Sequence, residues 1–239
     1  FHLCHHCERH ADYLAVLGVP MIVSFTDVCS REGIQNLDFT LDLKGTTVLH
    51  DPSERLSRAM LNAMVGLDEI LQGEIRIDGA LLEDYLCAGP QIRNFGYIFD
   101  EGIMLSNLSL KENLLLPLRW LDPNLNEVET VERILALMRD FGLELDLNQR
   151  PVVYRAGELK LLSYVRTLMI EPKVLLIDNP YYILNKRERS ILLQVLQDLR
   201  KRYCMLISSN DDDFLRGFAD QVVDLSSKAE NFVTAASLS

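Results

Sequence analysis

The residues with the clearest chemical meaning are Asp178 and Asn179, which directly follow an aliphatic run from Val174 to Ile177. Four consecutive aliphatic residues are typical of a strand that is buried on both faces of a parallel sheet. The acid would emerge at the carboxyl edge of that sheet, where open α/β folds bind ligands. An Asp in this place often holds Mg²⁺ beside a nucleotide phosphate. Asn179 has no charge with which to take a proton from water, so the pair predicts binding chemistry without a general base.

Composition narrows the classes of function. The chain has 239 residues, of which 48% are hydrophobic, enough for a sizeable core in one large domain or a core with a small subdomain. Its formal net charge of -11 would repel phosphate backbones, so we expect no nucleic-acid partner. The five scattered cysteines indicate free thiols in a reducing compartment. No apolar run is long enough to span a bilayer and no signal peptide is visible, so a cytoplasmic location is expected.

The first 20 residues form an expected tail of unusual composition. Cys4 and Cys7 have C-x-x-C spacing, and four of the five histidines lie close by. Zinc prefers four such ligands, but no second pair follows to complete a finger. We therefore interpret the segment as a Cys/His-rich tail that binds metal adventitiously, with a zinc site at Cys4 and Cys7 as the alternative, and expect the globular part to begin at Met21.

Hydrophobic periodicity predicts an α/β protein from Met21 onward. Strands are expected over 21–28, 34–43, 46–49, 73–78, 95–99, 174–178, 205–208 and 221–225, the first two as an antiparallel pair that turns at 31–33. Helices are expected over 56–66, 110–116, 128–141, 157–170 and 188–202. The helix at 110–116 leads into Pro117, Pro172 is expected to stop the helix at 157–170, and a short helix should follow the acidic run 211–213.

This order of elements resembles the ATPase subunit of an ABC transporter. Three segments carry the resemblance: LDEILQGEIRIDG (67–79), NFGYIFDEGIMLSNLSLKENLLLPLR (94–119) and RTLMIEPKVLLIDNP (166–180). The PLR ending of the second is similar to ATPases of bacterial lipid-transport systems. The resemblance implies one domain over 21–239, with a P-loop NTPase-like (RecA-like) core, an antiparallel β subdomain and a helical subdomain at about 101–165.

The resemblance also implies a phosphate loop, which departs from its pattern here. The motif G-x-x-x-x-G-K-[ST] lets backbone N–H groups approach the phosphates, which its lysine neutralises. It aligns with residues 51–58, where two acids and a leucine replace glycines and a serine replaces the lysine. Tight binding of ATP is therefore not expected, and an ordinary polar turn is the alternative. The loop residues that could still meet a nucleotide are Asp51, Ser53, Glu54, Arg55, Ser57 and Arg58.

Two of these residues could offset the loss of the lysine. Arg55 and Arg58 could partly replace its charge, or could fill the phosphate site by pairing with Asp178. Asp178 is the one member of the chemical set that is kept, and it could either hold a metal ion or be a buried acid capped by hydrogen bonds.

The remaining motifs implied by the resemblance are altered as well. Asp100 stands at the glutamine-loop position, where a neutral amide would contact Mg²⁺ and the attacking water. Ser209 stands at the switch-histidine position. The signature motif L-S-G-G-Q, which offers N–H groups to the partner subunit's γ-phosphate, keeps one glycine and gains a negative side chain. The signature-like residues are Arg155, Ala156, Gly157 and Glu158.

A docking surface for a membrane permease is implied between the core and the helical subdomain. The apolar residues of segment 99–120 could form it, or could simply fill the core of the helical subdomain. The candidates are Met104, Leu105, Leu108, Leu115, Leu116 and Trp120.

The hypothesis from sequence is a degenerate, non-hydrolysing ABC-type ATPase that serves as a structural or regulatory half of a transporter. It would lie at the inner face of the cell membrane through a permease, paired with a second copy or with an intact ABC ATPase. Two alternatives stay open. The chain could be an active ATPase with relocated phosphate ligands, or a stand-alone module that senses a nucleotide or another anion.

Overall fold

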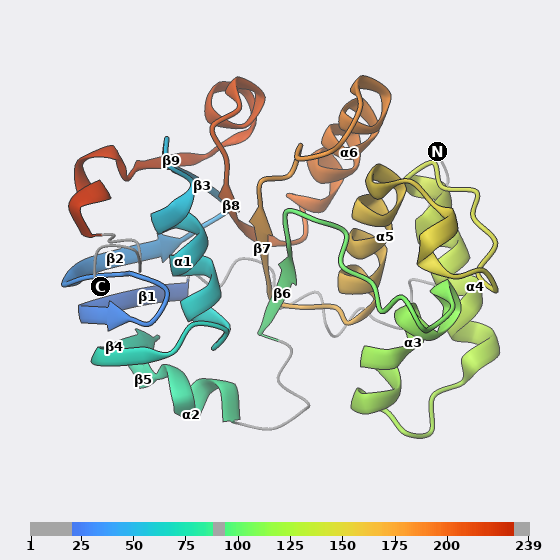
Figure 1. Ribbon diagram of the computed structural model, residues 1–239, viewed down its shortest axis with the longest axis horizontal. Helices are drawn as coiled ribbons and strands as arrows, with labels where there is room; N and C mark the ends of the chain where they lie inside the picture. Colours follow the sequence, from blue (N-terminus) through green and yellow to red (C-terminus); the bar gives the residue numbers. More distant parts are fainter. Residues whose placement is uncertain (1–20, 88–93, 232–239) are drawn as a thin grey trace.

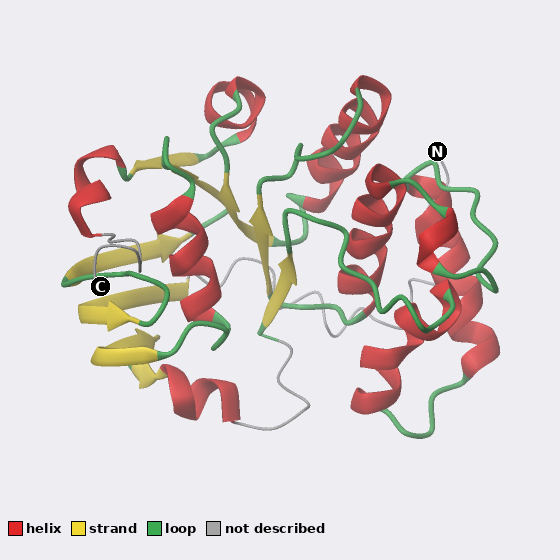
Figure 2. Cartoon of the chain, viewed as in Figure 1, coloured by secondary structure: helices red, strands yellow, loops and turns green. Residues whose placement is uncertain are grey.

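The computed structural model describes residues 21–87 and 94–231, so Cys4 and Cys7 of the expected tail lie outside it. The described chain forms two sheets with helices around them (Figures 1 and 2). One is a four-stranded antiparallel sheet in the order β2-β1-β4-β5, and the other a five-stranded parallel sheet in the order β6-β7-β8-β3-β9. This is the predicted α/β architecture with an antiparallel β portion.

The antiparallel sheet is built on a long first strand. β1 (Met21–Ser30) pairs with β2 (Leu37–Leu43) on one side and with β4 (Ile70–Ile77) on the other, and β4 continues into β5 (Ala80–Leu81). The predicted antiparallel pair is confirmed. Its alternating pattern buries one face, and a bulge between Phe25 and Val28 shifts the register.

The parallel sheet brings distant chain segments to a common edge. It consists of β3 (Thr46–His50), β6 (Phe95–Ile98), β7 (Val174–Asp178), β8 (Cys204–Ser208) and β9 (Gln221–Asp224). Asp178 at the end of β7 is in register with Ser208 at the end of β8, which is in register with Leu49 of β3. Because all five strands run parallel, the segments that follow β3, β7 and β8 leave the sheet at one edge.

Two hydrophobic cores lie on the two faces of this sheet. Successive residues of β7 alternate between them, with Leu175 and Ile177 in one core and Val174 and Leu176 in the other. The second core also contains α1 (Arg55–Met64) and the buried face of the antiparallel sheet. The first core lies among the helices that Figure 1 places on the other side of the sheet.

The helical side consists of α3 (Leu110–Leu121), α4 (Glu127–Asp140), α5 (Ala156–Met169) and α6 (Lys186–Leu199). Short helices α2 (Leu82–Cys87), η2 (Pro151–Val153), η3 (Asp213–Phe218) and η4 (Ser226–Asn231) complete the described chain. No helix among the described residues is both long and apolar enough to cross a bilayer.

The helix expected over 110–116 is longer than predicted. The helix continues through Pro117 to Leu121. Burial of Leu114, Leu115 and Leu118 on both sides of the proline holds the helix together, although the ring removes one backbone hydrogen bond.

Candidate functional site

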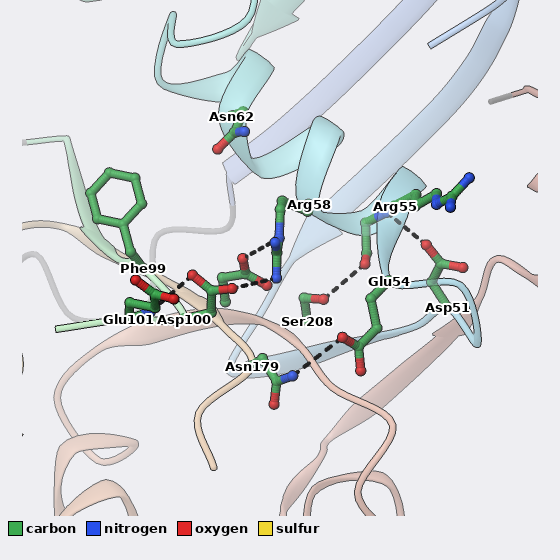
Figure 3. A network of polar contacts seen from close by, with 12 residues as sticks. Asp51, Glu54, Arg55, Arg58, Asn62, Phe99, Asp100, Glu101, Asn179 and Ser208 are labelled. Carbon is green, nitrogen blue, oxygen red and sulfur yellow. Dashed lines mark hydrogen bonds and ion pairs between the residues drawn. The ribbon is translucent and has the colours of Figure 1, made fainter. Parts of the chain in front are cut away.

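The candidate site lies where β3, β7 and β8 end and α1 begins (Figure 3). The loop at 51–54 connects β3 to α1 and corresponds to the altered phosphate loop. Segment 99–103 approaches from β6, and Asp178 closes β7. The topology therefore brings together three motifs that are spread over more than a hundred residues of the sequence.

The Asp51 side chain accepts hydrogen bonds from backbone N–H groups of the loop and of α1. Its side chain is buried and accepts hydrogen bonds from Ser53 N at 3.0 Å, Ser53 Oγ at 2.7 Å and Ser57 N at 3.0 Å. Ser57 lies in the first turn of α1, where unpaired N–H groups and the helix dipole favour an anion. A carboxylate of the chain itself therefore takes the place that a bound phosphate would need.

Glu54 gives the loop its backbone shape without glycine. Its φ of 58° lies in the left-handed region, where a side chain costs about 1–3 kcal/mol. The carboxylate accepts hydrogen bonds from Asn179 Nδ2 at 3.3 Å and from Asn210 Nδ2 at 3.4 Å. Because Glu54 faces residue 179, an amide there is compatible with it, whereas a second carboxylate would bring two like charges together.

Arg58 lies between two carboxylates, as Figure 3 shows. Its Nε is 2.7 Å from Asp178 Oδ2, and its Nη2 is 2.6 Å from Asp100 Oδ2. The predicted pairing of Arg58 with Asp178 is confirmed. Arg55 is exposed and extends away from these acids, so the corresponding prediction for Arg55 is wrong.

Burial and pairing act in opposite directions on this cluster. Burial raises the pKa of Asp178 to about 6, although Arg58 beside it favours the charged carboxylate. Partial burial disfavours the charge of Arg58, but Asp178 and Asp100 outweigh it and raise the pKa of the guanidinium. Asp178 Oδ1 is buried and has no hydrogen-bond partner among the described residues.

The residues present do not fit a magnesium-bound nucleotide. Two carboxylates that could ligate a divalent cation are already bridged by a guanidinium, and no cluster of three or more metal-ligating side chains occurs in the described ranges. Two of the N–H groups that could meet a phosphate, those of Ser53 and Ser57, are held by Asp51. The chain thus supplies both the cation and the anion of the site from its own side chains.

Lys160 is a member of the site that the sequence reasoning missed. It is fully buried in α5, and its Nζ donates to the carbonyl oxygens of Phe99, Asp178 (3.2 Å) and Asn179 (3.5 Å). Burial lowers the pKa of Lys160 to about 7, against the attraction of Asp178 and Asp100. A lysine directly before the apolar pair 161–162 on a helix was the signal that could have revealed it.

Ser57 and Ser209 have structural roles. Ser57 Oγ is buried 2.8 Å from Ser208 Oγ, which links α1 to the end of β8. Ser209 N donates to the Leu49 carbonyl at 3.1 Å, and Ser209 Oγ accepts from Asp211 N at 3.1 Å. The residue at the switch position is therefore buried, and its hydrogen bonds are made within the chain.

Comparison with known proteins decides the family. The family profile described as ABC transporter matches residues 59–182, more than half of the chain. The chain belongs to the ABC transporter family. The matched region begins just after Arg58 and includes Asp100, Asp178 and Asn179 of the site.

Curated relatives include ATP-binding proteins of importers. The chain is 27% identical over 197 residues to the molybdenum import ATP-binding protein ModC of Paramagnetospirillum magneticum, covering 80% of this chain and 53% of the relative. It is 28% identical over 188 residues to the sulfate/thiosulfate import ATP-binding protein CysA of Mesostigma viride, covering 77% of this chain and 52% of the relative. The chain spans about half the length of the curated relatives it matches. The narrower resemblance to lipid-transport ATPases stays a prediction.

Solved structures confirm the fold. A dimeric ATP-binding cassette in a post-hydrolysis state with ADP and Pi matches with a TM-score of 0.72 and 21% identity, covering 85% of this chain and 94% of that chain. The ATP-binding subunit of an ABC transporter matches with a TM-score of 0.69 and 25% identity, covering 86% of both chains. The predicted P-loop NTPase-like core is thus that of an ABC cassette.

The signature-like segment of this cassette forms the start of α5. Arg155 pairs with Glu158 at 3.1 Å and with Glu188 at 3.3 Å, and Glu158 caps the helix through the Arg155 N–H at 2.9 Å. Gly157 leaves room for Glu188, whose carboxylate would lie 2.4 Å from a Cβ at that position. No ion pair or side-chain hydrogen bond found among the described residues joins residues 155–158 to Arg58, Asp100 or Asp178.

Three of the six docking candidates line one groove. This α3–α5 groove has a volume of about 410 Å³ and is lined by Leu105, Asn113, Leu116, Pro117, Trp120 and Arg166. The prediction for Leu115 as a surface residue is wrong, because it is buried in the core on the helical side. Met104 is half-buried against the same core, and Leu108 is half-buried without lining the groove.

Proposed function

We propose that this chain is a non-hydrolysing ABC-type subunit that serves as a structural or regulatory half of a membrane transporter. One observation carries the proposal. Asp51 holds the phosphate-binding N–H groups, and Arg58 holds Asp178 and Asp100, so the chain's own side chains already supply the charges that Mg²⁺ and a nucleotide would bring.

The residue that follows Asp178 also offers no base for hydrolysis. Asn179 cannot take a proton from water, and its amide is engaged with Glu54. A nucleotide entering the site would have to displace Asp51 from the start of α1 and would meet the negative charge of Glu54. Each of these features opposes ATP turnover by a different physical route.

The partners are proposed from the family. ATP-binding proteins of importers are relatives of this chain, and a structural neighbour is dimeric. We therefore assign the chain a transmembrane permease as partner, at the cytoplasmic face of the cell membrane, through the α3–α5 groove. Its companion cassette would be a second copy or an intact ABC ATPase.

Phosphate release from ATP tests the central claim. The wild-type chain with millimolar ATP and Mg²⁺ is expected to release phosphate no faster than the Asp178→Ala variant. Turnover that is lost on Asp178→Ala would establish the active-ATPase alternative. A rise in melting temperature with ATP or ADP but without turnover would establish the sensing alternative, since a ligand at a hundred times its Kd stabilises by about 2.7 kcal/mol.

The role of the Arg58 guanidinium as the cation of the site can be tested separately with the Arg58→Ala variant. Removing the guanidinium leaves two acids facing each other, so the melting temperature at pH 8 should fall, and millimolar Mg²⁺ should restore part of it. Wild type should show no response to Mg²⁺. Arg55→Ala is the matched control, because Arg55 is exposed on the same helix and should change neither quantity. A Mg²⁺ response of equal size in wild type would contradict the proposal.

A further inference from the structure

Arg166, which reaches the α3–α5 groove from α5, is a partly buried cation without a carboxylate partner. Its one hydrogen bond among the described residues runs from Nη1 to Met104 Sδ at 3.6 Å, and a thioether sulfur is a weak acceptor. Burial lowers the pKa of Arg166, and no acidic neighbour in the described part of the chain counters that effect. Because arginine is seldom buried without a partner, this side chain calls for a counter-ion.

Other arginines of the structure show which kind of partner is missing. Arg58, Arg155 and Arg200 each pair with at least one carboxylate. A guanidinium held away from water gains most from a charged acceptor whose two oxygen atoms take two N–H groups at once. The ligand that suits Arg166 is therefore an anion with the geometry of a carboxylate.

The other polar residue of the groove is fully engaged. Asn113 Oδ1 accepts from Leu105 N at 2.7 Å, and Asn113 Nδ2 donates to the carbonyl oxygens of Leu105 and Ser109 at 3.0 and 2.9 Å. Both N–H groups of the amide are used, so Asn113 has no donor left for a ligand. Arg166 is thus the polar side chain of the described lining that is free to bind one.

The walls of the groove are apolar and open to solvent. Trp120 is 69% exposed, Leu116 49% and Leu105 48%, and the first two lie four residues apart on one face of α3. Exposed apolar side chains that gather around a hollow favour an apolar ligand. The groove volume of about 410 Å³ lies near the lower end of small-molecule sites, which suits one unbranched tail of about eight to ten carbons.

We propose that the α3–α5 groove binds a small monocarboxylate with an unbranched apolar tail, its carboxylate on Arg166 and its tail along Leu116 and Trp120. One guanidinium balances one negative charge, and no second cation lines the described groove. The net charge of -11 further disfavours a ligand with several negative charges. The site belongs to the free subunit, whatever the chain does in a transporter. A ligand bound there would compete with a permease for the same groove.

The experiment uses the single tryptophan of the chain as its reporter. A tail lying over Trp120 should shift its emission to shorter wavelength. The probes are octanoate, octanamide with the same tail and a neutral head, octylammonium with the opposite charge, and acetate without a tail. Octanoate should bind at least about tenfold more tightly than octanamide. Octylammonium and acetate should leave the emission unchanged at the same concentrations.

Variants assign the head and the tail of the ligand to separate side chains. Arg166→Gln should abolish the tenfold preference without lowering the melting temperature of the free protein, because it removes a charge that has no counter-ion. Arg166→Lys should keep part of the preference. Leu116→Ser should weaken octanoate and octanamide by the same factor. Arg119→Gln is the matched control and should change nothing, since Arg119 pairs with Glu127 and does not line the groove.

The outcomes separate this site from the proposed function. If octanoate and octanamide bind equally tightly, or if Arg166→Gln keeps the preference, the anion site is refuted. If neither probe shifts Trp120 emission at millimolar concentration, the groove binds no such ligand, while phosphate release still judges the non-hydrolysing proposal. Anionic phospholipid vesicles that shift the emission where octanoate does not would assign the groove to a lipid surface. A shift that grows with protein concentration alone would assign it to a second copy, and either result overturns the inference.

Discussion

Two buried ionisable groups beneath the sheet edge have pKa values displaced in opposite directions. Asp178 prefers to be neutral because it is buried, and Lys160 prefers to be neutral for the same reason. The charges of Arg58 and Asp100 lie close to both groups, so each of them affects the pKa of Asp178 and the pKa of Lys160. The charge state of the cluster therefore changes within the pH range in which proteins are normally handled.

This coupling predicts an unusual dependence of stability on pH. The folded pKa of Asp178 lies near 6, above its unfolded value, so the folded state binds more protons between about 4 and 6 and the free energy of unfolding falls as pH rises through that window. The folded pKa of Lys160 lies near 7, below its unfolded value, so the free energy of unfolding rises again above about 7. The cluster should contribute least to stability between pH 6 and 7.

Urea unfolding at intervals from pH 5 to 9.5 measures this profile. Asp178→Asn should flatten the limb below pH 6, and Lys160→Met should flatten the limb above pH 7. Lys201→Met is the control, because Lys201 is exposed and its ion pair is with the exposed Asp198 at 2.7 Å. If wild type is most stable near pH 6.5, or if neither variant changes its limb, the assignment is wrong.

The sequence was sufficient to predict one contact of this site, and for a physical reason. Arg58 follows a predicted buried strand with the spacing of a phosphate loop, so its pairing with Asp178 could be inferred from the family geometry. The role of Asp51 could not, because a carboxylate that folds back on Ser57 N–H depends on local backbone angles. Lys160 was not predicted as a site residue, because its three hydrogen-bond partners are backbone carbonyls, which every residue type carries and which the sequence therefore does not reveal.

At the scale of elements, segment 99–105 connects the charged cluster to the α3–α5 groove. Lys160 holds the Phe99 carbonyl, Arg58 holds Asp100, and Asn113 holds Leu105. Between these points Gly102 packs directly on the backbone of α5. The segment is thus fixed at both ends and in the middle, which keeps the rim of the groove in place without a nucleotide.

Gly102→Ala should break this arrangement. An added Cβ would lie 2.2 Å from the Leu159 carbonyl carbon and 2.3 Å from Lys160 N, and backbone atoms cannot move aside as a flexible side chain can. We expect a loss of at least about 1–3 kcal/mol in the free energy of unfolding, together with a shift in Trp120 emission. Urea unfolding followed by fluorescence gives both quantities.

Gly217→Ala is the matched control for that substitution. Gly217 lies in η3, and nothing within 4 Å would meet its added Cβ. Its free energy of unfolding should stay within about 0.5 kcal/mol of wild type. Equal losses in the two variants would show that the close approach of segment 99–105 to α5 is not what Gly102 provides.

At the scale of elements, the sequence predicted strands with a strong hydrophobic pattern correctly, but it did not predict a helix that continues through a proline or a short helix without an apolar period. Both buried strands that end at Asp178 and Ser208 were predicted within a residue. The passage of α3 through Pro117 depends on leucines packed on both sides, a tertiary effect that overrides the local preference. The short α2 carries no clear apolar period, so it gave no signal.

At the scale of the whole molecule, the parallel sheet lies between two hydrophobic cores and contributes side chains to both. Leu175 contributes to the core on the helical side, and Leu176 to the core beside α1 and the antiparallel sheet. Neither core can form without β7, because each uses alternate residues of the same strand. Residues 21–239 were predicted to be one domain, and this shared strand supports cooperative unfolding of the described part.

Trp120 makes that cooperativity measurable from one side of the sheet. Leu176→Ala removes a buried side chain from the core that does not contain α3, and it should cost about 2–5 kcal/mol. In a single cooperative unit, the transition seen by Trp120 fluorescence must shift as far as the one seen by circular dichroism. Leu175→Ala should produce the same shift from the other face, whereas Leu71→Ala, at a residue that is 61% exposed, should shift neither. If Leu176→Ala moved only part of the circular dichroism transition and left Trp120 unchanged, the two cores would unfold independently, and the groove and the Asp178 cluster would belong to separable units.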